Sequence, residues 1–255
     1  MNDTTSALQQ RLERKITGSI SAIIEGKTDE TESPLFAINW FDTRIAWVYH
    51  FYNWLASSRV FKIGGKVFFK GKNLQTISGN SSLVRDFLLI VNYPSGHAFL
   101  DLLSDRVFQV VSVLRAVAVK NFSFVLQKRI GEPQLLFDKI PKTEDFEKAH
   151  AVLHLAGVDG SKLEAVKTRL LQVSSANRCK LMFFGHEAGR VATANVTANA
   201  NSTAEPNHLD YVTPMTAVFS ATTQADLLNL FKSAAFQEFA NQLDDHYVAL
   251  LKRTM

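Results

Sequence analysis

The sequence has a single cysteine, no long apolar run and no extended block of like charge. Cys179 alone excludes an internal disulfide and a CxxC metal site, and we interpret it as a small hydrophobic residue of the interior. No apolar stretch approaches the roughly 18 residues that cross a bilayer. The charged residues Asp3, Glu13, Arg14 and Lys15 argue against an N-terminal secretory signal. We therefore expect a cytoplasmic protein that does not interact with membranes.

The charge balance is close to neutral for a chain of 255 residues, with a formal net charge of +4. That balance permits nucleic-acid binding without favouring it. Hydrophobic residues make up 46% of the chain and charged residues 20%, so a sizeable core can be buried in one large domain or two smaller ones. The 19 phenylalanines favour an aromatic-rich interior or interface.

Two helices near the start of the chain are amphipathic in different ways. Residues 5–25 carry one apolar stripe, end at Gly26 and are followed by the polar linker 27–34. The next helix is expected over 42–58, with Asp42 or Thr43 as its cap, and it is apolar on most of its circumference. One side of it should meet a sheet, and the other needs the N-terminal helix or another subunit. We expect a homo-oligomer that forms through one of these two helices.

The chain from 35 to 130 alternates strands and helices in the order β-α-β-β-α-β. Strands are predicted at 35–41, 66–71, 85–93 and 122–127, and the second helix begins at Ser95 and restarts at Ser104-Asp105. The apolar centre of the strand 85–93 implies that both of its faces are covered. This order is the ferredoxin-like, split βαβ arrangement.

The same order returns in the second part of the chain. "NYPSGHAFLDLLSDRVFQ" (92–109) corresponds to "SATTQADLLNLFKSAAFQ" (220–237), and "KVFFKG" (66–71) corresponds to "KLMFFG" (180–185). The two pairs differ in spacing because an Ala/Asn/Thr-rich stretch, 187–208, is inserted between them and reads as a loop. We therefore predict one unit written twice. The predicted division is an N-terminal helix and linker (1–34), a first repeat (35–130), a linker (131–148) and a second repeat (149–255).

The motifs "AINWF", "GGKVFFKG" and "NYPSGHAFLDLLSDRVFQ", the last followed by "LRAVAV", resemble a largely uncharacterised bacterial family of the dimeric α/β-barrel superfamily. The resemblance covers residues 35 to about 129. It implies an α+β fold in which the two ferredoxin-like repeats pack sheet against sheet and form a barrel within one chain.

The resemblance also implies a site, because the asparagine, tyrosine and arginine of the family fall on Asn39, Tyr93 and Arg115. The histidine that usually precedes this arginine is replaced by Leu114. In the second repeat the three positions align with His154, Ala221 and Leu243, so we expect one ligand site per chain, in the first repeat.

Each candidate residue has a structural and a functional interpretation. Asn39 lies in an otherwise apolar strand, where a buried amide must be hydrogen-bonded; it either fixes local structure or points at a ligand. Arg115 lies on an apolar stripe and needs a carboxylate, a carbonyl or an anionic ligand. Tyr93 is either a packed ring or a group that orients a substrate oxygen. His154 is either a core histidine or an acid-base group.

Histidines 150 and 154 do not form a metal site. In a strand they share a face but stand about 13 Å apart, at about 3.3 Å per residue, so they cannot bind one ion together. We expect neither a metal nor a cofactor.

Three functions from different classes follow from these observations. The first is a small cofactor-independent monooxygenase or isomerase that acts on an apolar or aromatic acid, with Asn39 and His154 as catalytic candidates and Asn39, Tyr93 and Arg115 as ligand contacts. The second is a ligand- or haem-binding module, or a structural oligomerisation module, without turnover. The third, RNA binding, needs a basic-aromatic strand that "RDFLLIVNY" does not provide, so nucleic acid is not expected as a partner.

Overall fold

The computed structural model describes residues 33–79, 84–130, 148–156, 160–189, 215–243 and 245–254. We refer to 33–130 as the first half and to 148–254 as the second half. The first half contains β1 (Leu35–Thr43), α2 (Ala46–Lys62), β2 (Lys66–Gly79), β3 (Phe87–Tyr93), α3 (Gly96–Ser104), α4 (Arg106–Ala118) and β4 (Val119–Arg129). The second half contains β5 (Ala149–Ala156), the short 3₁₀ helix η5 (Gly160–Lys162), α5 (Leu163–Ala176), β6 (Cys179–Gly189), β7 (Met215–Ala221), α6 (Gln224–Lys232), α7 (Ala234–Ala240) and β8 (Asp245–Arg253).

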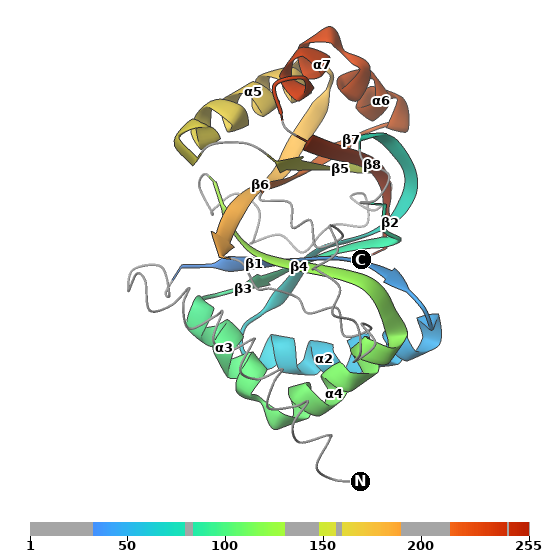
Figure 1. Ribbon diagram of the computed structural model, residues 1–255, viewed down its shortest axis with the longest axis vertical. Helices are drawn as coiled ribbons and strands as arrows, with labels where there is room; N and C mark the ends of the chain where they lie inside the picture. Colours follow the sequence, from blue (N-terminus) through green and yellow to red (C-terminus); the bar gives the residue numbers. More distant parts are fainter. Residues whose placement is uncertain are drawn as a thin grey trace, which may run out of the picture.

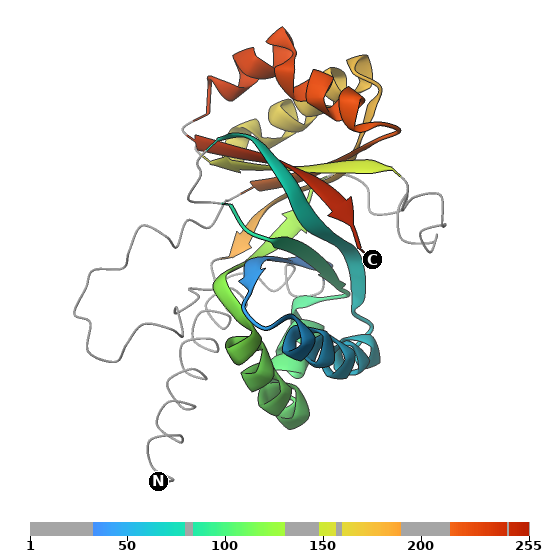
Figure 2. The same cartoon turned by 90° about the vertical axis from the view of Figure 1, so that its right-hand side faces the viewer.

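The eight strands form one closed antiparallel barrel in the order β1-β3-β2-β8-β5-β7-β6-β4. Each half contributes four neighbouring strands, and the halves join through the pairs β2–β8 and β4–β6. Figures 1 and 2 show helices α2, α3 and α4 outside the first-half strands, and α5, α6 and α7 at the opposite end of the molecule. The barrel therefore closes within a single chain, as the resemblance implied.

The strands are buried on both sides, so the core has three layers. In β1, Ala37 and Phe41 face the helices of the first half, whereas Ile38 and Trp40 face the barrel interior. A third cluster lies between the second-half sheet and its helices. Alternate side chains of a strand point to opposite faces, so a strand that is apolar at every position requires cover on both.

The two halves share local features as well as element order. Strands β2 and β6 both carry a bulge beside a buried phenylalanine, Phe69 or Phe183, and a glycine follows two residues later. A Cβ at Gly71 would lie 2.7 Å from the Phe69 ring, and one at Gly185 would lie 2.6 Å from the Phe183 ring. Glycine is thus required at both places because the ring folds over the backbone.

Several predicted boundaries are corrected by the structure. Helix α2 begins at Ala46 with Ile45 as its cap residue, not at Asp42 or Thr43. Those two residues continue β1, where the Asp42 carboxylate accepts hydrogen bonds from the backbone N–H of Asp86 (2.8 Å) and the side chain of Asn121 (2.7 Å). A carboxylate with partners on two other segments cannot also cap the helix.

The predicted caps of the later helices are confirmed. The Ser95 side chain accepts a hydrogen bond from the Ala98 N–H at the start of α3, and Asp105 accepts one from the Phe108 N–H at the start of α4. In the second half, Ser233 adopts an extended backbone and caps α7, so α6 and α7 are separate helices.

Three predicted segments lie largely outside the described residues: the N-terminal helix and linker before Ser33, the linker 131–148 up to residue 147, and the inserted loop after residue 189. Strand β6 continues to Gly189, so the first three residues of the stretch 187–208 belong to the sheet and not to the loop.

Candidate functional site

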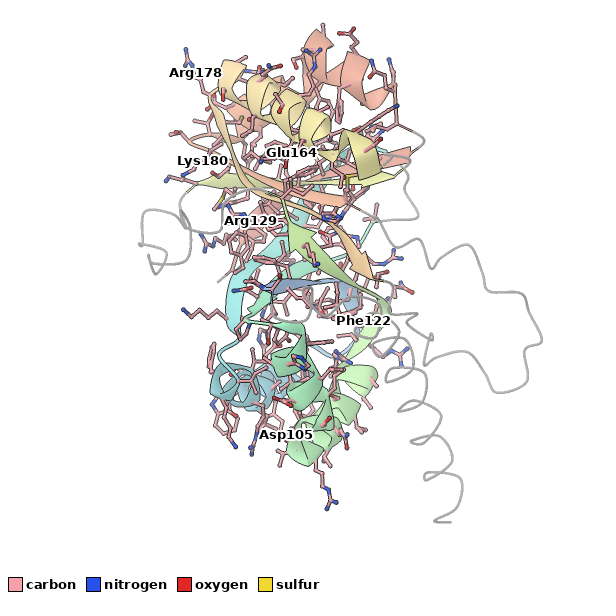
Figure 3. All side chains as sticks on the ribbon, turned by 90° about the vertical axis from the view of Figure 1, so that its left-hand side faces the viewer. Asp105, Phe122, Arg129, Glu164, Arg178 and Lys180 are labelled. Atoms are coloured by element: carbon pink, nitrogen blue, oxygen red, sulfur yellow. The ribbon has the colours of Figure 1, made fainter. Side chains whose placement is uncertain are left out.

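The side chains of Asn39, Tyr93 and Arg115 all belong to the layer between the first-half sheet and its helices, which we call the first helix–sheet layer. Asn39 lies on β1 between Ala37 and Phe41, two residues of this layer, and Tyr93 ends β3. Arg115 reaches the layer from α4, with its guanidinium 4.7 Å from the centre of the Phe122 ring. Figure 3 labels Phe122 and Asp105 on this side of the barrel.

The amide nitrogen of Asn39 is bound to the backbone. Its nitrogen donates hydrogen bonds of 3.2 Å to the carbonyl oxygens of Ala37 and Leu89. Leu89 is the residue that pairs with Asn39 across β1 and β3, so the side chain fastens the two strands together. The structure thus supplies the hydrogen bonds that a buried amide needs without a ligand.

Tyr93 and Arg115 lie at the two ends of a row of aromatic rings. The Tyr93 ring packs against Phe99 (centroids 4.9 Å apart), Phe99 stacks on Phe124 (5.8 Å), and Phe124 stacks on Phe122 (6.3 Å), over which Arg115 lies. Burial raises the pKa of the Tyr93 hydroxyl, while the nearby positive charge of Arg115 lowers it by a smaller amount. Tyr93 is therefore neutral at physiological pH.

Lys70 is a further cation of this layer that the sequence analysis missed. It pairs with Leu89 across β2 and β3, so Asn39, Leu89 and Lys70 form one row across three strands. Its side chain is buried beneath α2, with Nζ 5.2 Å from the centre of the Tyr49 ring, and burial lowers the pKa of the amine. Among the described residues neither Lys70 nor Arg115 forms an ion pair with a carboxylate.

Tyr49 on α2 is the ring over which Lys70 lies. It is buried between Phe41 and Tyr52, with ring centroids 5.0 and 6.1 Å away. Burial raises the pKa of its hydroxyl; the neighbouring Asn53 side chain and, more weakly, the Arg115 charge oppose this shift. The signal that could have identified this cluster is a lysine facing the helix side of an apolar strand, opposite a tyrosine-rich helix.

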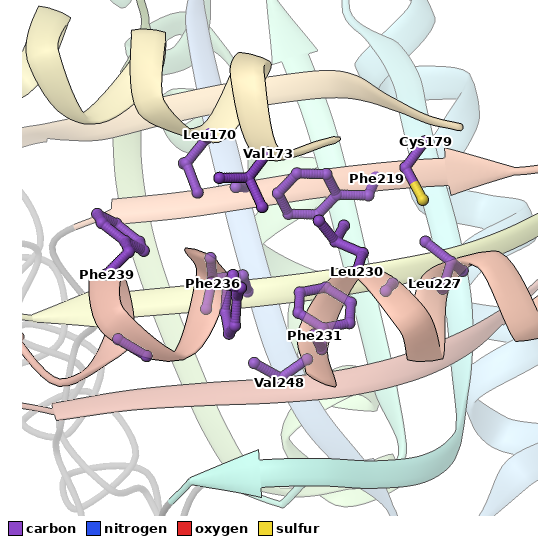
Figure 4. Packing of buried hydrophobic residues seen from close by; sticks show 14 of the residues in the cluster. Leu170, Val173, Cys179, Phe219, Leu227, Leu230, Phe231, Phe236, Phe239 and Val248 are labelled. Carbon is purple, nitrogen blue, oxygen red and sulfur yellow. The ribbon is translucent and has the colours of Figure 1, made fainter. Parts of the chain in front are cut away.

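The corresponding layer of the second half has no such polar groups. The pairing register matches Asn39, Leu89 and Lys70 with Leu153, Ala217 and Phe184, and it matches Tyr93 with Ala221. Figure 4 shows the resulting apolar packing, in which Phe219, Phe231 and Phe236 lie between the sheet and helices α5 to α7. Among the described residues, the second half has apolar side chains at the positions where the first half has Asn39, Lys70 and Tyr93.

The register also corrects the alignment of Asn39 with His154. His154 pairs with Thr216 as Trp40 pairs with Leu88, so Trp40 is the counterpart of His154. A shift of one residue in a strand moves a side chain to the opposite face. His154 therefore lies inside the barrel, on the other side of the sheets from Arg115.

Inside the barrel His154 belongs to an aromatic and hydroxyl-rich group. Its ring lies 5.0 Å from the Trp40 ring and stacks on Tyr247 at 6.1 Å between centroids. Its Nδ1 is 3.2 Å from the Thr216 hydroxyl, which also accepts a hydrogen bond of 3.0 Å from the Gln127 amide. Burial lowers the pKa of His154 to about 3, so the ring is neutral at physiological pH.

The remaining predictions about metals and membranes concern other parts of the chain. His150 and His154 face the barrel interior from the same strand, and no group of three or more His, Cys, Asp or Glu residues suited to a metal ion exists among the described residues. Cys179 is buried in the layer between the second-half sheet and its helices, and burial raises the pKa of its thiol to about 11. In the part of the chain that the structure describes, no helix is long and apolar enough to span a membrane.

Comparison with known proteins supports the fold. No family model matches the sequence, and no curated protein matches it. Among solved structures, an anthrone oxidase-like protein is similar with a TM-score of 0.51 and 10% identity, covering 88% of this chain and 92% of that one. A mutant chlorite dismutase from Candidatus Nitrospira defluvii gives a TM-score of 0.46 with 12% identity, covering 86% and 91% of the two chains.

A third match is limited to part of the chain. RPA0582, a protein of unknown function from Rhodopseudomonas palustris, gives a TM-score of 0.40 with 21% identity and covers 44% of this chain and 94% of its own. The closed barrel and the match to the anthrone oxidase-like structure agree in fold with the α/β barrel that the sequence predicted. At 10% identity this match supports the fold alone, and the function must be argued from the site.

Proposed function

We propose that the first helix–sheet layer binds a small aromatic or apolar acid, one molecule per chain. The observation that carries this proposal is that two cations of this layer, Lys70 over the Tyr49 ring and Arg115 over the Phe122 ring, have no carboxylate partner among the described residues. A cation withdrawn from water is costly unless an anion or a hydrogen-bond acceptor compensates it. A carboxylate or enolate ligand would compensate both cations, and the surrounding rings suit an aromatic body.

The proposal rests on the difference between the halves. We propose that residues 35–130 and 149–255 are two copies of one unit joined by the linker 131–148, with 1–34 as a separate N-terminal segment. In this view the second copy binds no ligand. At the positions of Asn39, Lys70 and Tyr93 it has Leu153, Phe184 and Ala221. Lys70 and Tyr93 then need a reason beyond folding, since the second copy packs without them.

The arrangement suits proton transfer to and from the ligand. Arg115, which is always charged, would hold the carboxylate or the developing enolate oxygen. Lys70, with its pKa lowered by burial, could take a proton from a carbon next to a carbonyl and return it elsewhere, which is an isomerisation. In the monooxygenase form of the proposal, the same carbanion reacts with dissolved dioxygen and a proton to give a hydroperoxide, which loses water and leaves a carbonyl at that carbon. Asn39 fastens β1 to β3 beneath this site, and His154, which faces the barrel interior, takes no part.

Binding of 1-naphthoate and of the uncharged 1-naphthalenemethanol can be measured by isothermal titration calorimetry. We expect Arg115→Leu to weaken naphthoate binding at least tenfold and to leave the weaker binding of the alcohol unchanged. Lys72→Met is a matched control, because Lys72 is an exposed cation on the same strand as Lys70. Equal affinities for Arg115→Leu and wild type would contradict the proposal, and loss of the folded circular dichroism spectrum would make Arg115 a structural residue.

Catalysis has a separate readout, because the alternative function is ligand or haem binding without turnover. Phenylpyruvate, an aromatic acid with an exchangeable CH₂ group, can be incubated with the protein in D₂O and followed by NMR. We expect the wild type to accelerate deuterium uptake, and Lys70→Met to abolish that acceleration even at phenylpyruvate concentrations that saturate the variant. Binding without accelerated exchange would favour the non-catalytic alternative.

A further inference from the structure

The outer surfaces of α2 and α4 form an apolar face that has no cover among the described residues, and we call it the α2/α4 face. It consists of a row of aromatic side chains on α2 and a row of valines on α4: Trp47, Phe51, Trp54 and Phe61, and Val107, Val110, Val113 and Val117. Trp47, Trp54 and Val110 are 70–73% exposed. Neither helix contains an aspartate or a glutamate.

The two rows run side by side because α2 and α4 pack antiparallel. At one end the backbone N–H groups of Arg44 and Ile45 donate to the Ala118 carbonyl (2.7 and 3.1 Å), and at the other end Arg59 pairs with Asp105 (3.7 Å). Both views of the ribbon place α2 and α4 together at the end of the molecule far from the second half (Figures 1 and 2). Trp47 is thereby level with Val117, and Trp54 with Val110.

The size of this face is that of a protein interface and not of an ordinary surface. Its eight side chains expose an area on the order of 900 Å², whereas the largest apolar patch of a typical monomer is about 300–600 Å². A stable interface buries about 800 Å² on each partner. The inner surfaces of the same helices already pack on the sheet through Val48, Tyr52 and Val111, so they cannot rotate to hide the outer one.

We propose that a second copy of this chain covers the α2/α4 face in a two-fold symmetric dimer. The face is complementary to itself: it has a ridge of large rings on one helix and a shallow row of β-branched side chains on the other. Rotation of a copy by 180° brings the aromatic row of each protomer onto the valine row of its partner, as a two-fold interface requires. Four helices then pack as a bundle across the axis.

Charge favours a second copy over an anionic membrane surface. A helix that binds such a surface typically carries many Lys and Arg side chains on its polar face. On α2 the basic residues are confined to the last turn, where Arg59 is already paired with Asp105. Other exposed positions on this side of the helices are His50 and Ser58, while the cations Lys62 and Arg106 lie at the end marked by the Arg59–Asp105 pair, so the middle of the face carries no charge.

The dimer can be tested on the full chain by sedimentation velocity between 1 and 100 µM. We expect a mass of twice 28.5 kDa for the wild type. Trp54→Glu and Val113→Glu should each raise the dissociation constant at least a hundredfold while the circular dichroism spectrum is unchanged. Leu171→Glu on α5 is the matched control, because it changes an exposed leucine outside the face and should leave the mass as it is.

Tryptophan fluorescence gives an independent measurement, because Trp47 and Trp54 are two of the three tryptophans. Their emission should shift to shorter wavelength as the protein is concentrated, and Val113→Glu should remove this shift. A wild type that stays monomeric at 100 µM would overturn the proposal. A dimer that Val113→Glu leaves intact would also overturn it, because the interface would then lie elsewhere. Two further results would assign the face to another occupant: a monomer that dimerises only after deletion of residues 1–28, or a monomer that sediments with vesicles of phosphatidylcholine and phosphatidylglycerol.

Discussion

At the scale of single residues, His154 shows how the barrel interior sets a protonation state. Its ring is fully buried beside Trp40, Tyr247 and Thr216, and burial lowers its pKa from 6.5 to about 3. In the unfolded chain the same ring binds a proton below about pH 6.5. Between these values the unfolded state holds more protons than the folded one, so stability is present above pH 6.5 and is lost as the pH falls toward 3.

We therefore predict that His154 makes the protein acid-sensitive. The free energy of unfolding should fall by up to about 1.4 kcal/mol for each pH unit below 6.5 through this residue alone. His154→Asn should be less stable than wild type at pH 7, and the difference should shrink by pH 4.5 in urea denaturation. His97→Asn, at an exposed position, serves as the control. A difference between His154→Asn and wild type that does not change with pH would contradict the argument.

The residues of the candidate site were only partly predictable from the sequence. The resemblance selected Asn39, Tyr93 and Arg115, and in the structure all three side chains lie in the first helix–sheet layer. Lys70 was missed because a strand pattern alone does not say which face of β2 meets α2. The bulge between Val67 and Phe69 changes the alternation just before it.

At the scale of elements, the repeated Phe-Gln dipeptide has the same role in both halves. The side chain of Gln109 donates a hydrogen bond to the Leu103 carbonyl (2.9 Å), and that of Gln237 donates one to the Phe231 carbonyl (2.6 Å). Each glutamine lies in the second helix of its pair, and each acceptor lies near the end of the preceding helix. The bond therefore fixes the break between the two helices of each pair.

We predict that Gln109→Met and Gln237→Met each lower the free energy of unfolding by about 0.5–1.5 kcal/mol, the usual net value of one hydrogen bond. Methionine keeps the length of the side chain but leaves the carbonyl without this donor. Chemical denaturation measures the change, and Gln75→Met, at an exposed position of β2, is the control. If the two substitutions are as neutral as the control, the shared dipeptide has no part in fixing the break.

The elements were predictable where the signal is local, and less so where it depends on tertiary partners. Ser95 and Asp105 cap helices by bonding to N–H groups three residues away, which a sequence reveals directly. Asp42 has the same chemistry but finds Asp86 and Asn121 instead, on segments about 44 and 79 residues away. The start of α2 could therefore not be read from the residues next to it.

At the scale of the whole molecule, closure of the barrel buries one face of every strand against the other half. The interior cluster draws Phe36, Ile38 and Ile90 from the first half and Val152, Phe183 and Ala249 from the second. The Phe36 and Phe183 rings lie 5.0 Å apart across the junction. The continuous apolar centre of the strand 85–93 predicted that both faces of the sheet are covered. The pairs β2–β8 and β4–β6, which close the barrel, depend on contacts between distant segments.

Separation of the halves tests this closure most directly. A fragment of residues 30–130 exposes the inner faces of β1, β2, β3 and β4, together with two unpaired edges, and both favour association. We expect this fragment to aggregate or to pair with itself when expressed alone. It should form a one-to-one complex when coexpressed with residues 148–255, as size-exclusion chromatography with light scattering would show. The second fragment supplies the missing β6 and β8 edges, which the first cannot provide as a monomer. A stable, soluble monomer of residues 30–130 would mean that the interior of the barrel contributes little to folding.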